Sequence, residues 1–413
     1  MPSPGRRDLA TGASATAPSG SADYAWFSAG VGSWFGAFGM QGAIFAWLLV
    51  GVLDAPGQWV GIAQTSNMLP SLFLVLLGGA VADRYDPRRL LIGLHGLMAL
   101  PMLALLVLLA SDRLSVGWLI AFGLCQGTVS AFAMPARDTL LSRVAGGDMM
   151  RAVTGMTVVQ FGSQSLGTLL VGSARWIGIM PMLLIQAITV LLGAGAAFLI
   201  RADARPPADR AIRSALPEIL EGLRIVARTP NLRVPIALVL AVGCLFVGPF
   251  LVVFPILVRD LYHGTQLELS LTLSLFPLGT IAGSGLMLLR GGITRKGLGA
   301  LNALATGALA LGAVGLALPF WGMVLATFAW GLAGAVFINC SRALFQEAAP
   351  VAQRGRVLAV YQMGFMGSAP LGALTAGFLS EFQGPLPTLL AFAIAMLAVV
   401  AAAWSFSDAP RMR

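Results

Sequence analysis

Long apolar stretches, separated by short polar connectors, run along almost the whole chain of 413 residues. A helix needs about 20 apolar residues to cross the hydrocarbon core of a bilayer, and twelve stretches approach that length. In the first half they cover roughly 27–52, 59–82, 90–110, 117–137, 152–173 and 178–200. In the second half they cover roughly 234–258, 266–289, 297–317, 319–341, 356–379 and 386–406. The pattern therefore predicts an all-α membrane protein with twelve transmembrane helices.

Two polar segments interrupt this pattern. Residues 1–24 are rich in Ser, Ala, Gly and Pro and lack the apolar core of a signal peptide, which predicts a disordered cytoplasmic tail. Residues 201–233 are rich in arginine and separate two bundles, 25–200 and 234–407, of which the second is followed by a short C-terminus, 408–413. Within this linker the stretch SALPEILEGLRIVAR predicts an amphipathic helix along the membrane surface, with its apolar residues at Leu216, Ile219, Leu220, Leu223 and Val226.

Composition supports the membrane assignment, and the placement of the positive charges predicts how the chain is oriented in the membrane. Only 10% of the residues are charged, against about 25% in soluble domains. The net charge of +9 does not indicate nucleic acid, because the lysines and arginines share one side of the predicted helices when the N-terminus is cytoplasmic. The exceptions are Arg113, Arg175 and Arg259. Both termini are thus predicted to be cytoplasmic.

The two halves of the chain resemble one another. At an offset of 205 residues, GSQSLGTLLVG (162–172) matches GSAPLGALTAG (367–377), while Arg137 matches Arg342 and Arg151 matches Arg356. An ungapped match that includes two arginines predicts two related six-helix bundles, arranged as parallel repeats about an axis normal to the membrane.

Charge is concentrated in one connector, GGAVADRYDPRRLL (78–91), between the second and third predicted helices. Gly79 is expected to let a neighbouring helix approach closely. Asp83 needs a partner once it is partly buried, and two are available: Arg137 and the N-terminus of the eleventh helix near Arg356. If these contacts form only when the cytoplasmic side is closed, they latch an outward-open state. The remaining arginines, Arg84, Arg88 and Arg89, are expected in the headgroup zone.

This connector has the form G-x-V-x-D-R-x-x-x-R-R and resembles the signature loop of the major facilitator superfamily. The resemblance extends to the twelve spans, the six-plus-six repeat and the basic central loop. MPARDTLL (134–141) and LPEILEGLRIVARTPNLR (216–233) are similar to the drug and siderophore exporter branch that includes the enterobactin exporter. The resemblance implies transport by alternating access in a bacterial inner membrane, with no cofactor and a single chain as the working unit.

Substrate would bind near the middle of the bilayer between the halves, where polar residues are functional candidates. Gln41 and Gln164 are the strongest of these. The full set of cavity candidates is Ser33, Trp34, Gln41, Gln126, Ser130, Gln160, Gln164, Trp330, Asn339, Tyr361 and Gln362. The glycines Gly32, Gly36 and Gly39 are expected to serve helix contact instead.

No acidic residue falls in the middle of a predicted span. The resemblance to drug antiporters implies a carboxylate in the first span and a Gly-Pro pair in the fifth, but the chain has neither, with Gly162-Ser163 in place of the pair. Neutral, zwitterionic or anionic amphiphiles are therefore favoured over cations as substrates. Proton coupling would use Asp83, Asp138, Glu347 or His95.

A secondary-active exporter of amphipathic small molecules is the favoured function. A facilitator or uptake carrier, such as a lysophospholipid transporter, is the alternative, since the residues alone do not set the direction of transport. An enzyme is not expected, because catalysis needs convergent titratable groups and the chain has only two histidines and no Cys/His metal pattern. With Lys296 as the sole lysine, the chain also lacks an ATP-binding Gly-rich Lys loop. The expected partners are the lipid bilayer, the substrate and protons.

Overall fold

The computed structural model describes residues 20–145, 149–201, 215–290, 293–349 and 353–412. Over these residues the elements are helical, as expected for an all-α membrane protein. The first half contains α1 (Gly20–Trp47), η1 (Leu48–Val52), α2 (Gly57–Arg84), α3 (Pro87–Ala110), α4 (Val116–Val144), α5 (Met149–Val171), α6 (Ala174–Ile177) and α7 (Ile179–Leu199). After α8 (Ala215–Arg228), the second half contains α9 (Pro230–Val242), η2 (Gly243–Val247), α10 (Gly248–Asp260), α11 (Gln266–Leu289), α12 (Lys296–Gly315), α13 (Phe320–Ala348), α14 (Arg354–Gln383), α15 (Pro385–Phe406) and η4 (Ala409–Arg411).

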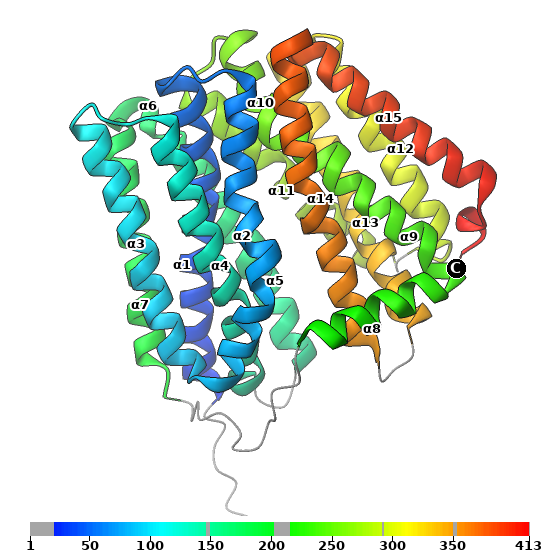
Figure 1. Ribbon diagram of the computed structural model, residues 1–413, viewed down its shortest axis with the longest axis horizontal. Coiled ribbons are helices and arrows are strands. Elements are labelled where there is room, and N and C mark those ends of the chain that lie inside the picture. The colour runs from blue at the N-terminus through cyan, green and yellow to red at the C-terminus, as the bar shows by residue number, and fades with distance from the viewer. Residues whose placement is uncertain (1–19, 146–148, 202–214, 291–292, 350–352, 413) are drawn as a thin grey trace, which may run out of the picture.

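The helices form two groups that lie side by side (Figure 1). In the first, α1 packs on α5 and α7, and α4 packs on α2 and α3. In the second, α13 packs on α11 and α12, and α14 packs on α10. The two groups converge toward the end that carries α6 and diverge toward the end where α8 runs across the helices. These ends are called the α6 end and the α8 end below.

Ten described stretches are long and apolar enough to cross a membrane. They do not include α2 and α5, although these helices have 28 and 23 residues and pack against α4 and α1. In α2 the run Gln64, Thr65, Ser66, Asn67 interrupts the apolar sequence. The count of twelve transmembrane helices therefore stays a prediction.

The expected boundaries of the polar segments are wrong at two places. Residues 20–24 of the predicted tail begin α1, where Asp23 lies in the first turn and its carboxylate accepts a hydrogen bond from the Arg201 backbone at 2.8 Å. The rest of the tail lies outside the described residues. At the linker, α8 confirms the predicted helix, but α9 already begins at Pro230, since proline is well suited to the first helical turn.

The internal repeat is confirmed by backbone geometry. The described residues with positive φ outside the helices lie in connectors at the α6 end, and they pair between the halves. Gly178 and Gly384 share φ 87° and occupy equivalent positions before α7 and α15. The other pairs are Asp112 with Ala317 and Asp54 with His263.

The repeated motif has the same packing role in both halves. The middle glycine of each copy, Gly167 or Gly372, faces the backbone of its own half's first helical stretch, at Gly36 and Cys244 respectively, with no room for a Cβ. The last glycine of each copy faces the other half instead: Gly172 meets Leu267, and Gly377 meets Gly57. The motif thus encodes one contact within each group and one contact between the groups.

Candidate functional site

The two groups meet most closely along α2 and α14. A Cβ on Gly61 would lie 2.6 Å from the Ala373 carbonyl oxygen, and a Cβ on Gly377 would lie 2.6 Å from the Gly57 carbonyl oxygen. A residue with a side chain cannot occupy these positions without moving the helices apart. The contact reaches Leu72, beside Gly367, so it follows α2 for about 22 Å at 1.5 Å per residue.

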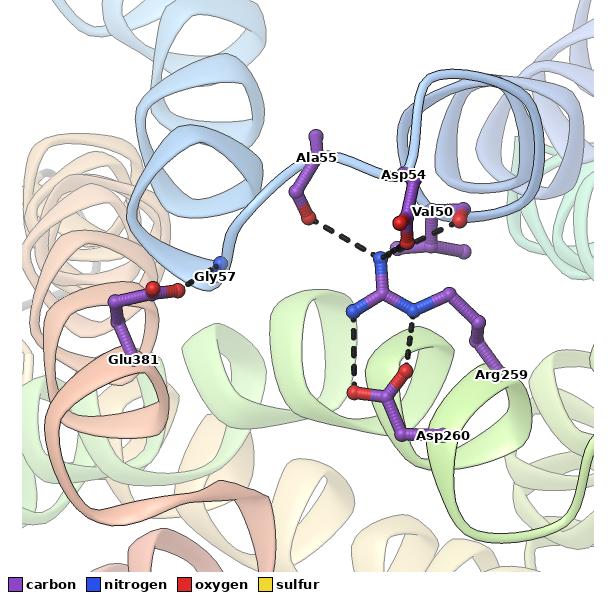
Figure 2. A network of polar contacts seen from close by, with 7 residues as sticks. All are labelled: Val50, Asp54, Ala55, Gly57, Arg259, Asp260 and Glu381. Atoms are coloured by element: carbon purple, nitrogen blue, oxygen red, sulfur yellow. Dashed lines mark hydrogen bonds and ion pairs between the residues drawn. The ribbon is translucent and has the colours of Figure 1, made fainter.

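Arg259 joins the groups at the rim of the α6 end (Figure 2). Its guanidinium lies 2.8 Å from the Asp54 carboxylate and donates to the carbonyl oxygens of Val50 at 3.4 Å and Ala55 at 3.3 Å, all in the first group. It also pairs with the neighbouring Asp260, to which Nη2 donates at 3.0 Å. Asp54 adopts φ 47°, a left-handed conformation that aspartate tolerates better than most residues. One half-buried cation therefore binds a carboxylate from each group and two backbone carbonyls of the first group.

Two further charged contacts lie at the same end. The Glu381 carboxylate accepts a hydrogen bond from the Gly57 backbone N–H at 2.7 Å, at the positive N-terminus of α2 (Figure 2). Arg175 lies 3.7 Å from Glu268, which also closes a capping box with Thr265 at the start of α11. Two of the three arginines predicted outside the cytoplasm thus connect the two groups.

Polar side chains continue this seal toward the membrane centre. Gln64 donates to the Leu251 carbonyl at 3.2 Å and Thr65 donates to the Pro370 carbonyl at 3.1 Å. Both side chains are buried. Within the second group, burial raises the pKa of Tyr262, whose hydroxyl donates to the Leu318 carbonyl at 2.6 Å and joins two connectors of that group. The α6 end is accordingly closed by packing and by hydrogen bonds.

At the α8 end, the signature connector differs from expectation in its glycine. A Cβ on Gly79 would meet nothing within 4 Å, so the predicted role of Gly79 in close approach is wrong. Gly78 has that role: a Cβ there would collide with the backbone of Ala131 in α4. The face of α2 that meets α4 falls one residue earlier than the motif suggested.

The charges of this connector serve several local structures. Asp86 caps α3 and accepts from the Arg88 backbone N–H at 2.9 Å, and its carboxylate lies 3.7 Å from Arg89. The Arg88 guanidinium donates to the last carbonyls of α7, at Ala197 and Phe198, and lies over the Phe198 ring. Arg84 is exposed in the last turn of α2. The side chain of Asp83 lies outside the described part of the structure, so its latch remains a prediction.

The other predicted latch and proton residues have partners at the α8 end. Arg137 pairs with Asp138 at 2.9 Å and lies 5.1 Å from the centre of the Phe35 ring. Arg356 pairs with Glu221 of α8 at 2.8 Å, which ties the linker to α14. Glu347 pairs with Lys296 at 3.0 Å.

The cavity candidates divide by burial. Five candidates are buried: Trp34, Gln41 and Gln126 within the first group, and Trp330 and Tyr361 within the second. Two candidates are exposed, Asn339 and Gln362. The half-buried candidates are Ser33, Ser130, Gln160 and Gln164. The expectation for the α1 glycines is confirmed at Gly39, where a Cβ would collide with the Gln164 backbone.

Three glutamines form a buried layer in the first group, one of which the sequence reasoning missed. Gln186 donates to the Gln41 side-chain oxygen at 2.6 Å and to the Ala37 carbonyl at 3.1 Å. Phe45 and Phe122 pack one turn away on α1 and α4 with ring centres 6.0 Å apart, so Gln126 lies at the level of Gln41. Both amide atoms of Gln126 are buried without a hydrogen-bond partner in the described residues.

Replacing Gln126 with leucine is expected to raise thermal stability. An unpartnered buried polar group costs about 1 to 3 kcal/mol, and leucine of similar volume removes two such atoms. The midpoint of thermal unfolding in detergent should rise, with transport within about twofold of the parent. A lower midpoint would show that the amide has a partner, and Gln126→Glu serves as the control that should destabilise.

Aromatic side chains cluster in the second group, about 15 Å at 1.5 Å per residue from the α6 ends of α10, α11 and α13. Trp330 is buried and contacts four phenylalanine rings with centre distances between 5.1 and 6.0 Å: Phe246, Phe250, Phe254 and Phe276. Phe250 and Phe276 are half-buried, and Phe250 precedes the Leu251 carbonyl that binds Gln64 of the other group. This cluster offers apolar ring faces where the two groups meet.

Comparisons with known proteins agree with this architecture. A family model described as transmembrane secretion effector matches residues 13–412. The multidrug efflux pump Tap of Mycolicibacterium fortuitum is 25% identical over 395 residues, covering 91% of this chain and 92% of that protein.

Solved structures share the fold at low identity. The nucleoside transporter NupG superposes with a TM-score of 0.74 at 14% identity, covering 92% of this chain and 98% of that one. A bacterial homologue of the human lysosomal transporter Spinster, in an inward-facing and unoccupied conformation, gives 0.73 at 12% identity, covering 96% and 98%. A D-xylose–proton symporter gives 0.73 at 14% identity, covering 94% and 98%.

Proposed function

Because the chain belongs to the transmembrane secretion effector family of major facilitator transporters, we propose that it is a secondary-active exporter of amphipathic small molecules. The seal at the α6 end carries this proposal, together with the 25% identity to a multidrug efflux pump over most of both chains. Packing of α2 on α14 closes one end, and the groups diverge toward the other (Figure 1). Such an arrangement suits a carrier that exposes its interior to one side at a time.

The distribution of arginines gives the orientation of this state. With the α8 end in the cytoplasm, the basic connectors lie inside and the three exceptions lie outside. We therefore propose an inward-open carrier of the inner membrane, with both termini cytoplasmic, that acts as a single chain. Substrate enters from the cytoplasm or the inner leaflet and meets the aromatic rings of Phe250 and Phe276.

The substrate class follows from the scarcity of charge between the groups. The apolar and aromatic lining favours lipophilic molecules, and no described acid lies midway along one of the long helices of the two groups to neutralise a cation. Neutral, zwitterionic or anionic amphiphiles therefore fit better than cations. Proton coupling runs through acids at the α8 end, namely Asp83, Asp138 and Glu347, or through His95.

Transport by the purified protein in liposomes tests this function. Accumulation of neutral, anionic and cationic amphiphiles, such as chloramphenicol, carboxyfluorescein and tetraphenylphosphonium, is measured with and without an imposed pH gradient. We expect gradient-driven accumulation of a neutral or anionic compound. Transport of the cation alone would contradict the substrate class, and transport that only equilibrates would contradict proton-coupled export.

Equilibration without accumulation would support the second candidate, a facilitator or uptake carrier such as a lysophospholipid transporter. The observation that favours it is that the described long helices of the two groups carry no acid midway along their length, which leaves the gradient without a membrane-embedded carboxylate.

Asp83→Asn is expected to impair transport more than Arg88→Gln. Asp83 is proposed to latch the α8 end when that end closes, and asparagine removes the charge. Arg88 holds the end of α7 from a partly exposed position, so its loss should lower stability by about 1 kcal/mol or less and leave transport largely intact. Initial rates in liposomes compare the two variants, and small, equal effects would refute the latch.

A further inference from the structure

The linker helix α8 has three distinct faces, of which one is buried against the second group. Gly222 and Val226 are buried, and a Cβ on Gly222 would lie 2.8 Å from the Arg356 carbonyl oxygen of α14. On a second face, the side chains of Leu220 and Leu223 are exposed. At about 100° per residue, this apolar face lies about 110° around the helix axis from the buried one. Two large apolar side chains therefore project beside the protein rather than into it.

Two arginines make up the third face. Arg224 and Arg228 are exposed and lie about 90° further around the axis, next to the apolar face. They are one helical turn apart, which places their Cβ atoms about 6 Å from one another. Neither forms a salt bridge within the described part of the chain, and Glu221 of the same helix pairs instead with Arg356 at 2.8 Å. α8 thus offers an apolar strip bordered by two such cations.

The contact with α14 fixes the depth of α8 in the membrane. α14 has 30 residues, so at 1.5 Å per residue it exceeds the hydrocarbon core of a bilayer by about 7 Å at each end. Gly222 of α8 meets α14 at Arg356 and Val360, which lie about 3 to 9 Å from the start of that helix. α8 also runs across the spanning helices rather than along them (Figure 1). The helix is therefore held at the boundary between acyl chains and headgroups.

We propose that α8 binds anionic phospholipid at the surface of the bilayer. Acyl chains cover Leu220 and Leu223, as in other amphipathic helices that lie in the membrane interface. The phosphate oxygens pair with Arg224 and Arg228, whose guanidinium groups can each bind a phosphate through two hydrogen bonds. A zwitterionic lipid offers the same phosphate but carries a compensating ammonium group, so the two arginines favour lipids with a net negative charge. This site does not depend on which compound the chain transports.

Quenching by brominated lipids tests which lipid lies against this face, without any transport step. In the full chain with Cys125, Cys244 and Cys340 replaced by alanine or serine, Leu223→Cys is labelled with bimane and reconstituted in nanodiscs. The nanodiscs contain phosphatidylglycerol and phosphatidylcholine in equal amounts, with bromine on the acyl chains of only one of them. We expect phosphatidylglycerol to associate with the labelled face about 5- to 30-fold more strongly, because each arginine near the surface favours an anionic lipid about fivefold.

Paired substitutions separate a site on α8 from the general charge of the surface. Arg224→Gln with Arg228→Gln should bring the ratio of the two association constants close to one, because glutamine preserves the helix and removes the charge. Arg224→Lys with Arg228→Lys keeps both charges and should retain most of the selectivity. The matched control is Arg290→Gln with Arg295→Gln, which removes two exposed arginines next to α11 and α12 at the same end. It should leave the ratio unchanged.

A bimane label at Leu309→Cys, exposed on the membrane-spanning helix α12, should be quenched by both lipids with a ratio near one. At Leu223→Cys, equal quenching by the two lipids would show contact without recognition of charge and would overturn the proposal. Blue-shifted emission that neither lipid quenches would assign the face to a protein partner or a second copy of the chain, and water-like emission would leave the face uncovered. Either result, or an equal loss of selectivity in the Arg290→Gln and Arg295→Gln control, would also overturn it.

Discussion

Arg259→Gln is expected to make the α6 end open about 5- to 30-fold more often than in the parent. This factor corresponds to a closed state that is less stable, relative to the open state, by about 1 to 2 kcal/mol. Arg259 is the residue through which Asp54, Val50 and Ala55 of one group contact the other. Asp54 and Asp260 are largely or partly exposed and regain water when the arginine is removed, which limits the effect. The two backbone carbonyls lose their donor.

Thiol labelling measures this opening. The background protein has Cys125, Cys244 and Cys340 replaced by serine or alanine. A single cysteine is then introduced by Thr65→Cys, at a position buried between α2 and α14. This thiol should react with an impermeant maleimide only when the α6 end opens. Arg259→Gln should raise the labelling rate by the factor given above. Arg113→Gln, an exposed arginine at the same end, should leave it unchanged, and equal labelling in both variants would show that Arg259 is not a clamp.

Gly377→Val is expected to reduce transport by about 100-fold or more while both helix groups stay folded. A Cβ at Gly377 would meet the Gly57 carbonyl oxygen at 2.6 Å and Gly61 Cα at 2.9 Å, both rigid backbone atoms of the other group. The α6 end could then not close, and a carrier that cannot close one end cannot complete its cycle. Initial rates in liposomes and a thermal melt of the same preparation test both parts of the prediction.

Valine substitutions at other glycines serve as controls for Gly377→Val. Gly172→Val should have a smaller effect, because the nearest atom to the added Cβ is in the Leu267 side chain, which can move, and the nearest backbone atom, the Leu169 carbonyl oxygen, is 3.1 Å away. Gly372→Val should unfold the second group, since it collides with the Cys244 backbone inside that group. Gly42→Val, with open space around its Cβ, should behave as the parent. A Gly377→Val protein that transports normally would show that the close contact of α2 and α14 is dispensable.

The helical fold was accessible from the sequence because apolar length and arginine placement are strong, additive patterns in membrane proteins. The repeated glycines were accessible for the same reason, as the offset of 205 residues brought Gly167 and Gly372 into register. The pattern could not show that Gly377 contacts the other group while Gly372 contacts its own. That distinction depends on how the helices are rotated, which helix periodicity within one segment does not fix.

The closed end was the part of the site that the sequence reasoning missed. Charge is dense in the connector that carries Asp83, which made that connector the predicted gate. Arg259 lies in a predicted outer loop that carries no comparable cluster of charged residues. One available pattern did point to it: Arg175 and Arg259 break the positive-inside bias, and both pair across the groups. Gly79 was assigned the wrong role for a simpler reason, because a one-residue shift rotates a helical position by about 100°.

The central claim is that the two helix groups rock so that one end closes as the other opens, and paired distance measurements test it most directly. Spin labels at Val52 and Leu261 report the α6 end, and labels at Ser142 and Gln346 report the α8 end; all four positions are exposed. In nanodiscs, Arg259→Gln should lengthen the first distance and shorten the second within the same population. Distances that change in the same direction, or an α8 end that does not respond, would contradict alternating access by this chain.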